Sequence, residues 1–92
     1  MTMNAVYIKV DPERIVHALR EEAVEKVNAA DGEVILDFSS VLRIDSNAAG
    51  AMEELAVLAG DRSVKVVLRG VNVGIYRVLK LLQLTGRFTF LN

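Results

Sequence analysis

The chain has 92 residues, which is enough for one domain with a single hydrophobic core and too few for two. An apolar fraction of 52%, a mean hydropathy of +0.33 and 25% charged residues indicate a folded globule and exclude a disordered chain. The net charge of -1 gives no bulk attraction to nucleic acid or to an anionic membrane, and the absence of cysteine excludes disulfides and thiolate metal sites.

The first third of the sequence predicts a strand followed by a helix. Residues 6–10 are rich in the β-branched and aromatic types that suit a pleated surface. Asp11 and Pro12 predict a helix start, because Asp caps free N–H groups and proline at the first helical position gives up no hydrogen bond. Asp31-Gly32 ends this helix. Its apolar stripe comprises Ile15, Val16, Leu19, Ala23 and Val27.

Two more strand–helix pairs and a last strand follow. Residues 34–38 are nearly continuous in apolar side chains, which is typical of a strand buried on both faces of a helix-covered parallel sheet. Helices are predicted over 46–59, with Gly60 as the terminating residue, and over 73–82. Strands are predicted over 64–68 and 88–91. We expect one shared core that contains Val34, Leu36, Val66, Leu68, Ile75 and Leu79.

The order β-α-β-α-β-α-β predicts an α/β fold: a small, single-layer, mainly parallel sheet with helices packed on it, forming one domain over residues 1–92. Functional sites in open sheets of this kind lie at the carboxyl ends of the strands. The loop 39–46 leaves the second predicted strand at such an end. It is therefore the first place to look for a site.

The sequence offers little material for catalysis or for binding a cofactor. His17 is the only histidine, and its place inside the first predicted helix favours a partly exposed structural residue over a catalytic or ligating one. The glycines form neither a GxGxxG nor a GxxxxGK[ST] motif. The neighbouring pairs Glu21-Glu22 and Glu53-Glu54 diverge on a helix surface. We predict no enzyme, no metal site and no cofactor.

Polar residues gather where the second predicted helix begins. Asp45, Ser46 and Asn47 are all good N-cap residues, so starting the helix is one complete explanation for them. The other explanation is a hydroxyl displayed at a helix N-terminus, with the small residues 48–51 keeping the surface around it open. A phosphate on Ser46 would lie at the positive end of the helix dipole and would add about -1.5 to -2 charge beside Asp45.

Residues 36–50 resemble the signature of the STAS family, the anti-sigma factor antagonists and their relatives. In that family a strand ending in LDLS is followed by DSSGLG or DTSGL, and the Ser or Thr after the Asp is phosphorylated. Asn47 and Ala48 depart from this pattern, whereas the segment 68–82 also resembles the family. The resemblance implies Ser46 as the phosphorylation site and a supporting role for Asp37 and Ser39; we also expect a supporting role for Asp11 at the start of the first predicted helix. The resemblance also implies a partner-binding surface made of Asp45, Ser46, Asn47, Ala48, Ala49 and Gly50.

The resemblance leaves three functions open. The first is a bacterial transcription regulator that binds an anti-sigma factor serine kinase until Ser46 is phosphorylated. The second is a constitutive subunit that docks on the ATPase of a lipid-transport ABC system; the tail of such subunits runs from L-x-G-V-N into a Tyr-bearing helix, which residues 68–82 resemble. The third is a stressosome-type scaffold. In each case we expect a cytoplasmic protein with a protein partner, no nucleic acid and no membrane insertion; a homodimer stays open.

Overall fold

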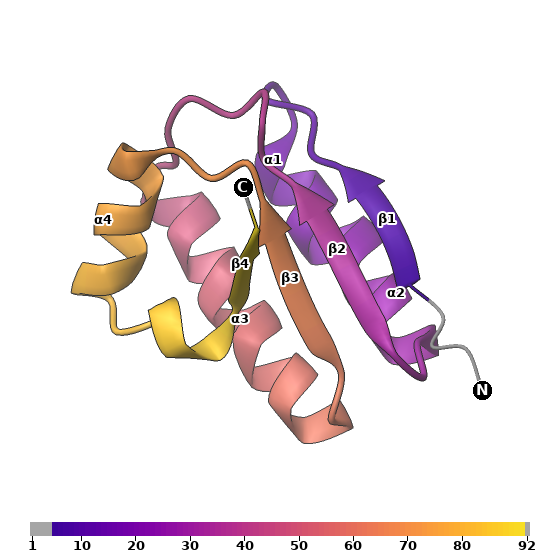
Figure 1. Ribbon diagram of the computed structural model, residues 1–92. Coiled ribbons are helices and arrows are strands. Elements are labelled where there is room, and N and C mark those ends of the chain that lie inside the picture. The colour runs from indigo at the N-terminus through magenta and orange to yellow at the C-terminus, as the bar shows by residue number, and fades with distance from the viewer. Residues whose placement is uncertain (1–4, 92) are drawn as a thin grey trace.

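Four parallel strands in sequential order form the sheet of the computed structural model, which describes residues 5–91 (Figure 1). The observed order of strands and helices confirms the predicted α/β class, and every strand pair is parallel. The elements in chain order are β1 (Ala5–Lys9), α1 (Ile15–His17), the π-helix η1 (Ala18–Ala23), α2 (Val24–Ala29), β2 (Glu33–Asp37), α3 (Ser46–Arg62), β3 (Lys65–Arg69), α4 (Val73–Leu81), the 3-10 helix η2 (Thr85–Arg87) and β4 (Thr89–Leu91).

The helices cover one face of the sheet, as Figure 1 shows. Each crossover moves the chain one strand further in the same direction, because the strand order is β1-β2-β3-β4. Right-handed crossovers that all move in one direction place their helices on the same side. The structure therefore differs from the expectation that helices cover both faces of β2. Helices cover only one of its faces, and no helix of residues 5–91 covers the other.

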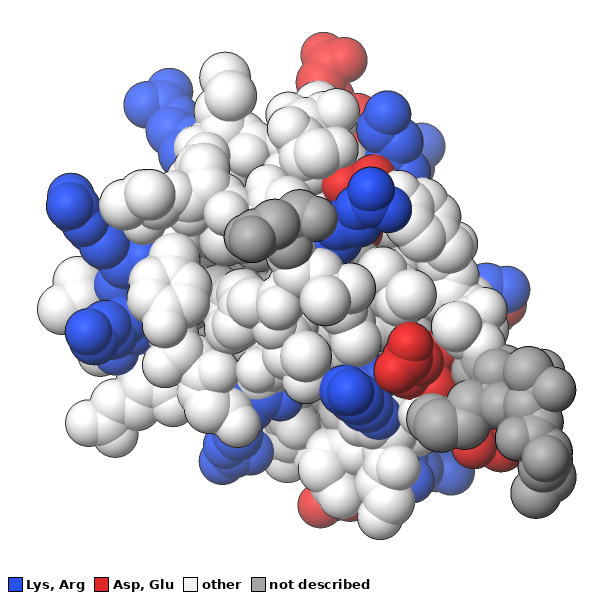
Figure 2. Space-filling view, viewed as in Figure 1, with Lys and Arg blue, Asp and Glu red and all other residues white. Residues whose placement is uncertain are grey.

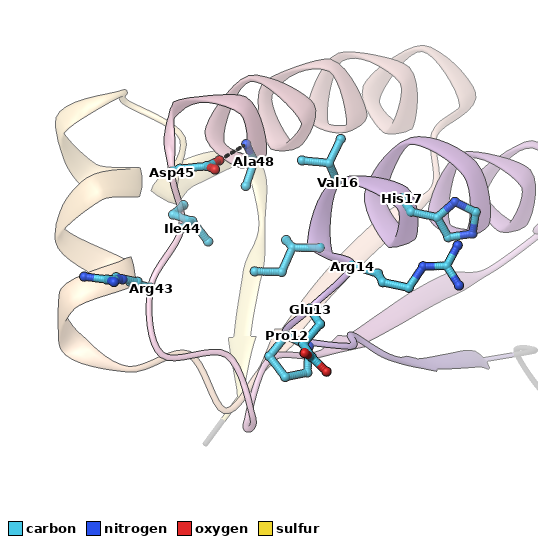
Figure 3. Close-up of a pocket in the computed structure, with 10 residues that line it drawn as sticks. Pro12, Glu13, Arg14, Val16, His17, Arg43, Ile44, Asp45 and Ala48 are labelled. Carbon is cyan, nitrogen blue, oxygen red and sulfur yellow. Dashed lines mark hydrogen bonds between the residues drawn. The ribbon is translucent and has the colours of Figure 1, made fainter.

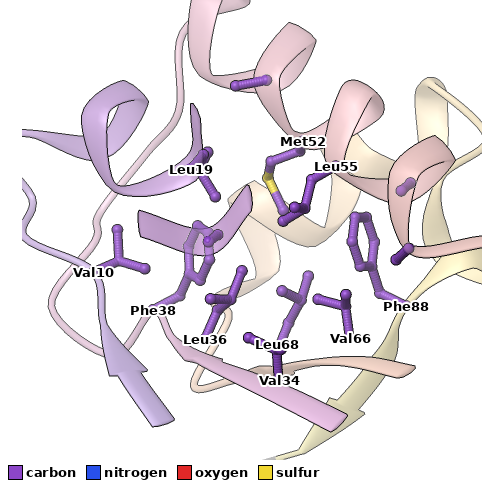
Figure 4. Packing of buried hydrophobic residues seen from close by; sticks show 14 of the residues in the cluster. Val10, Leu19, Val34, Leu36, Phe38, Met52, Leu55, Val66, Leu68 and Phe88 are labelled. Atoms are coloured by element: carbon purple, nitrogen blue, oxygen red, sulfur yellow. The ribbon is translucent and has the colours of Figure 1, made fainter. Parts of the chain in front are cut away.

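The hydrophobic core lies between the sheet and these helices (Figure 4). Strand register aligns inward-facing residues in rows, so that Ile8, Leu36 and Leu68 lie side by side on adjacent strands. Phe38 is fully buried at the end of β2. The six residues predicted to share a core do so, which confirms that prediction: Val34, Leu36, Val66, Leu68, Ile75 and Leu79.

Two predicted helix boundaries are wrong. The first helix begins at Ile15, because Asp11 instead closes a turn in which its Oδ1 accepts from the Glu13 N–H at 2.9 Å. Helix α3 continues through Gly60 to Arg62. It ends where Ser63 takes the left-handed conformation, φ 55°, which leaves Gly60 as an interior helical residue.

Within residues 5–91, no helix combines the length and the apolar character needed to cross a bilayer. The longest of the described helices, α3, carries two pairs of charged residues, at 53–54 and 61–62, and packs its small and apolar residues against the core.

Candidate functional site

The loops that follow β1, β2 and β3 meet at the carboxyl edge of the sheet, the upper edge in Figure 1. This is the edge at which parallel sheets commonly carry their sites. The loop after β2 is the longest of the three and delivers the chain to Ser46, the first residue of α3. The predicted loop 39–46 and the helix start at Ser46 therefore both lie at the carboxyl edge of the sheet.

Asp45, and neither Ser46 nor Asn47, caps helix α3. Asp45 has an extended backbone, and its Oδ1 accepts a hydrogen bond from the Ala48 N–H at 2.8 Å. Ser46 and Asn47 are both exposed, and the Ser46 hydroxyl forms no hydrogen bond with another of the described residues. The capping role is thus filled without Ser46, whose hydroxyl is accessible from solvent.

The start of α3 forms a ridge between two hollows. One, of about 430 Å³, lies between residues 12–17, which form a turn and α1, and the segment 43–48. The other, of about 420 Å³, lies between α3 and α4 and is lined by Ser46, Gly50 and Leu82 among others. Figure 3 shows that Arg43 points away from the first hollow and that Arg14 reaches toward His17. A protein docked on the ridge could therefore place side chains in the hollow on either side of it.

Two of the residues expected in the docking surface point inward. Ala48 is 1% exposed and Ala49 is 8% exposed, so they offer a partner little surface beyond their contribution to the walls of the hollows. Gly50 is half-buried. Their small size instead brings the first turn of α3 close to the core. The accessible ridge is formed by Asp45, Ser46 and Asn47.

Asn72 ties the Ser46 loop to the start of α4. Its side-chain amide donates to the Leu42 carbonyl at 2.8 Å, and its Oδ1 accepts from the Ile75 N–H at 2.9 Å. One side chain thus caps α4 and holds the middle of the β2–α3 loop. This connection joins residues about 30 positions apart, and it was missed at the sequence level. The only available signal was an Asn placed just before a predicted helix.

Asp37 holds the beginning of the same loop from the outer face of the sheet. Its Oδ1 accepts from the Ser39 N–H at 2.8 Å, and its Oδ2 accepts from the Tyr7 hydroxyl. The Tyr7 hydrogen bond, followed by those from Ser39, lowers the pKa of Asp37 from its ordinary 3.8 to about 2. The same hydrogen bond raises the pKa of Tyr7. Asp37 and Ser39 therefore support the loop, whereas Tyr7 is a partner that the sequence did not reveal.

Replacing Tyr7 with Phe is expected to make the protein unfold at higher pH in an acid titration. Because the pKa of Asp37 is lower in the folded state, its carboxylate stabilises the fold above about pH 4, and that stability is lost as the pH falls from 3.8 to about 2. Removing the Tyr7 hydroxyl removes the largest cause of this shift. Far-UV circular dichroism against pH measures the midpoint.

Tyr76→Phe is the matched control, because the Tyr76 ring packs edge-on against Phe90, with ring centroids 5.1 Å apart, and its hydroxyl bonds no carboxylate within residues 5–91. Its acid midpoint should equal that of the parent protein. A Tyr7→Phe midpoint equal to this control would show that the hydrogen bond does not set the pKa of Asp37.

Replacing Asp45 with Ala is expected to lower the free energy of unfolding by about 0.5–2 kcal/mol, because α3 loses its N-cap. Asn47→Ala, one position inside the exposed helix start, should change it by less than about 0.5 kcal/mol. Urea denaturation followed by circular dichroism measures both. Equal stability of the Asp45→Ala variant and the parent would assign the cap to another residue.

The other sequence candidates lie away from the ridge or carry no site chemistry. Asp11 closes its own turn in the loop after β1. His17 is exposed, and its Nε2 lies 3.7 Å from an oxygen of Glu22, five residues later, a spacing that the π-helix places on one face. Within the part of the chain that the structure describes, no group of three acidic or histidine side chains is placed to hold a metal ion.

Comparisons with known proteins agree with this fold. A family model described as "Mlab, STAS domain" matches residues 10–91. A crystal structure of a candidate anti-sigma factor antagonist from Thermotoga maritima, the protein TM1081, superposes with a TM-score of 0.71 at 20% identity and covers 100% of this chain and 75% of that one. An NMR structure of TM1081 gives 0.73 at 19% identity, covering 98% and 75%. These likenesses show a shared fold. No curated protein matches the sequence significantly.

Proposed function

The chain belongs to the STAS domain family, and from that premise we propose that it is a single, non-enzymatic docking domain that binds a partner protein through the ridge at Ser46. The partner is an anti-sigma factor serine kinase, and phosphorylation of Ser46 dissociates the complex. The observation that carries the proposal is that capping of α3 does not use the Ser46 hydroxyl. Asp45 caps the helix, and the Ser46 hydroxyl is accessible and forms no hydrogen bond within residues 5–91.

A phosphate on Ser46 is compatible with the fold. The modified residue stands at the N-terminus of a 17-residue helix, where the helix dipole favours negative charge, and the Asp45 cap stays in place. The effect of the phosphate therefore falls on binding. It adds charge next to the Asp45 carboxylate on the surface that meets the partner, and an unpaired charge at an interface weakens the complex.

A second candidate is the constitutive subunit of a lipid-transport ABC system, docked on its ATPase. The Mlab description of the matched family supports it, together with the resemblance of residues 68–82 to the STAS subunits of such systems. In this case the same ridge docks, and Ser46 acts as a neutral contact that is never phosphorylated. Both candidates use the ridge, and they differ in whether a phosphate is found there.

Ser46→Asp is expected to weaken partner binding by about 1–4 kcal/mol, whereas Ser46→Ala should bind normally and resist phosphorylation. Neither change should unfold the domain, because Asp45 remains the cap. The measurements are the intact mass of protein from its own host, with and without phosphatase, and calorimetric titration of the partner that copurifies. Asn28→Asp, which adds the same charge on the exposed surface of α2, should bind normally.

A phosphate on Ser46 that is lost with phosphatase supports the switch. If Ser46 carries no phosphate under any growth condition and Ser46→Ala is indistinguishable from the parent in the cell, the switch is abandoned in favour of the transporter subunit. Equal weakening by Ser46→Asp and Asn28→Asp would remove the ridge itself from the docking surface.

A further inference from the structure

Charge is divided unevenly along this chain, although the net charge is only -1. All twelve acidic residues lie at or before Asp61, and six of the eleven basic residues follow it. Every charged residue in the last third of the chain is therefore basic. In Figure 2 the side of the molecule occupied by α4 in Figure 1 shows blue and white atoms and no red ones.

Helix α4 carries two stripes. The inner stripe, at positions 75, 78, 79 and 82, faces the core and the groove against α3, and its Ile75 and Leu79 are buried. The outer stripe repeats the i, i+3, i+4, i+7 spacing on the opposite side and extends it to i+8. It comprises Val73, Tyr76, Arg77, Lys80 and Leu81. A helix with apolar residues on both sides is normally buried on both, yet this outer stripe faces solvent.

The outer stripe combines exposed apolar side chains with a shallow socket. Val73 is 66% exposed and Leu81 is 84% exposed. Tyr76 is held by its edge-on contact with Phe90, and a hollow of about 240 Å³ opens between Val73, Tyr76 and Leu91. A rigid aromatic residue beside a hollow is the kind of place that takes a bulky apolar anchor. Leu42 of the β2–α3 loop is also exposed, and its carbonyl accepts a hydrogen bond from Asn72 at the start of α4.

We infer that the outer stripe of α4 is a docking surface for a protein segment that presents a bulky apolar anchor and carboxylates. The anchor enters the hollow beside Val73, and the carboxylates face Arg77 and Lys80. The inference rests on the proposed docking function and deepens it by giving the chemistry of the partner. It needs no phosphate on Ser46, so the α4 surface and the Ser46 switch can fail separately.

The order of residues within the stripe favours a protein over a lipid surface. Around the helix, Lys80 and Arg77 lie between Tyr76 and Leu81, with Val73 between the two cations. Pressing the apolar side chains into a bilayer would press the cations in with them, whereas membrane-surface helices keep charged and apolar faces apart. A protein segment can place carboxylates directly opposite the two cations.

The test uses the isotope-labelled full chain and two synthetic helical peptides of about four turns. Both peptides carry leucines at i, i+3, i+4 and i+7; one has glutamates and the other has lysines at the flanking positions. We expect the acidic peptide to shift the amide signals of residues 73–81 and to bind about tenfold more tightly than the basic one. Lys80→Glu should weaken this binding about tenfold, and Leu81→Ser about fivefold.

Lys26→Glu is the matched control, because Lys26 is an exposed lysine on α2 and the charge change is the same. It should leave binding within about twofold of the parent. Equal weakening by Lys26→Glu and Lys80→Glu, equal affinity for the two peptides, or no shift at any peptide concentration overturns the inference.

Two further outcomes also overturn it by naming a different occupant. Binding to vesicles of phosphatidylcholine and phosphatidylglycerol that Lys80→Glu abolishes would assign the stripe to a membrane surface. Concentration-dependent self-association in analytical ultracentrifugation that Lys80→Glu abolishes would assign it to the acidic helices of a second copy. Failure of any of these tests leaves the mass-spectrometric test of Ser46 unaffected.

Discussion

Replacing Leu36 with Ala is expected to lower the free energy of unfolding by about 2–5 kcal/mol. Leu36 is fully buried at the centre of the sheet, between Ile8 of β1 and Leu68 of β3, and beneath the helices. Truncation removes the transfer free energy of the side chain and leaves a cavity that close-packed neighbours fill only in part. Urea denaturation followed by circular dichroism measures the change.

Ile35, the adjacent residue, is the control for this prediction. It points to the outer face of the sheet and is half-buried. Ile35→Ala should cost about 1–2 kcal/mol, because less apolar surface returns to water and no enclosed cavity forms. Equal losses for the two variants would contradict a core that lies on one side of the sheet only.

Replacing Gly70 with Ala is expected to lower the free energy of unfolding by about 2–4 kcal/mol and to displace the β2–α3 loop. Gly70 has φ +73°, a conformation that costs a residue with a Cβ atom. The added Cβ would also lie 2.9 Å from the Ser39 Cβ and 3.0 Å from the Ser39 Cα. Relief requires the chain after β2 or after β3 to move, so amide chemical shifts should change over residues 38–46.

Gly60→Ala is the control for backbone effects of a glycine substitution. Gly60 lies inside α3, and nothing lies within 4 Å of its added Cβ. Alanine should therefore stabilise the helix by about 0.5–1 kcal/mol. If Gly70→Ala is as stable as Gly60→Ala, the close approach between Gly70 and Ser39 does not hold the loop.

The sequence alone was enough to predict the four strands, the helical segments between them and the inner stripes of those helices, whereas the π-helix η1 and the 3-10 helix η2 were not predicted. Helical and strand periodicities identify the residues that share a face, such as Ile75 with Leu79, and these residues do share the core. Capping chemistry placed a helix start at residues 45–47. It left open which of the three residues forms the cap, because Asp, Ser and Asn are nearly equivalent there. The tertiary structure selects Asp45 and leaves Ser46 accessible.

Helix ends were harder to predict, because each depends on small differences between competing signals. Gly60 favours termination, but the buried Leu55, Ala56 and Ala59 hold the last turns of α3 against the core. Packing outweighs the cost of one interior glycine, about 1 kcal/mol, so the helix ends three residues later at Ser63. Asp11 and Pro12 likewise form a turn, and the helix starts at Ile15.

Local signals were enough to predict the α/β class, the order of the strands and the helical segments between them, and the position of Ser46 at a helix start, because each follows from residues close together in the chain. The folded structure was needed to show that the helices cover one face, that Tyr7 meets Asp37 and that Asn72 holds the loop before Ser46. The Tyr7–Asp37 and Asn72–Leu42 hydrogen bonds each join residues 30 positions apart. They depend on strand order and register, which are fixed when the whole sheet packs and which no local pattern records.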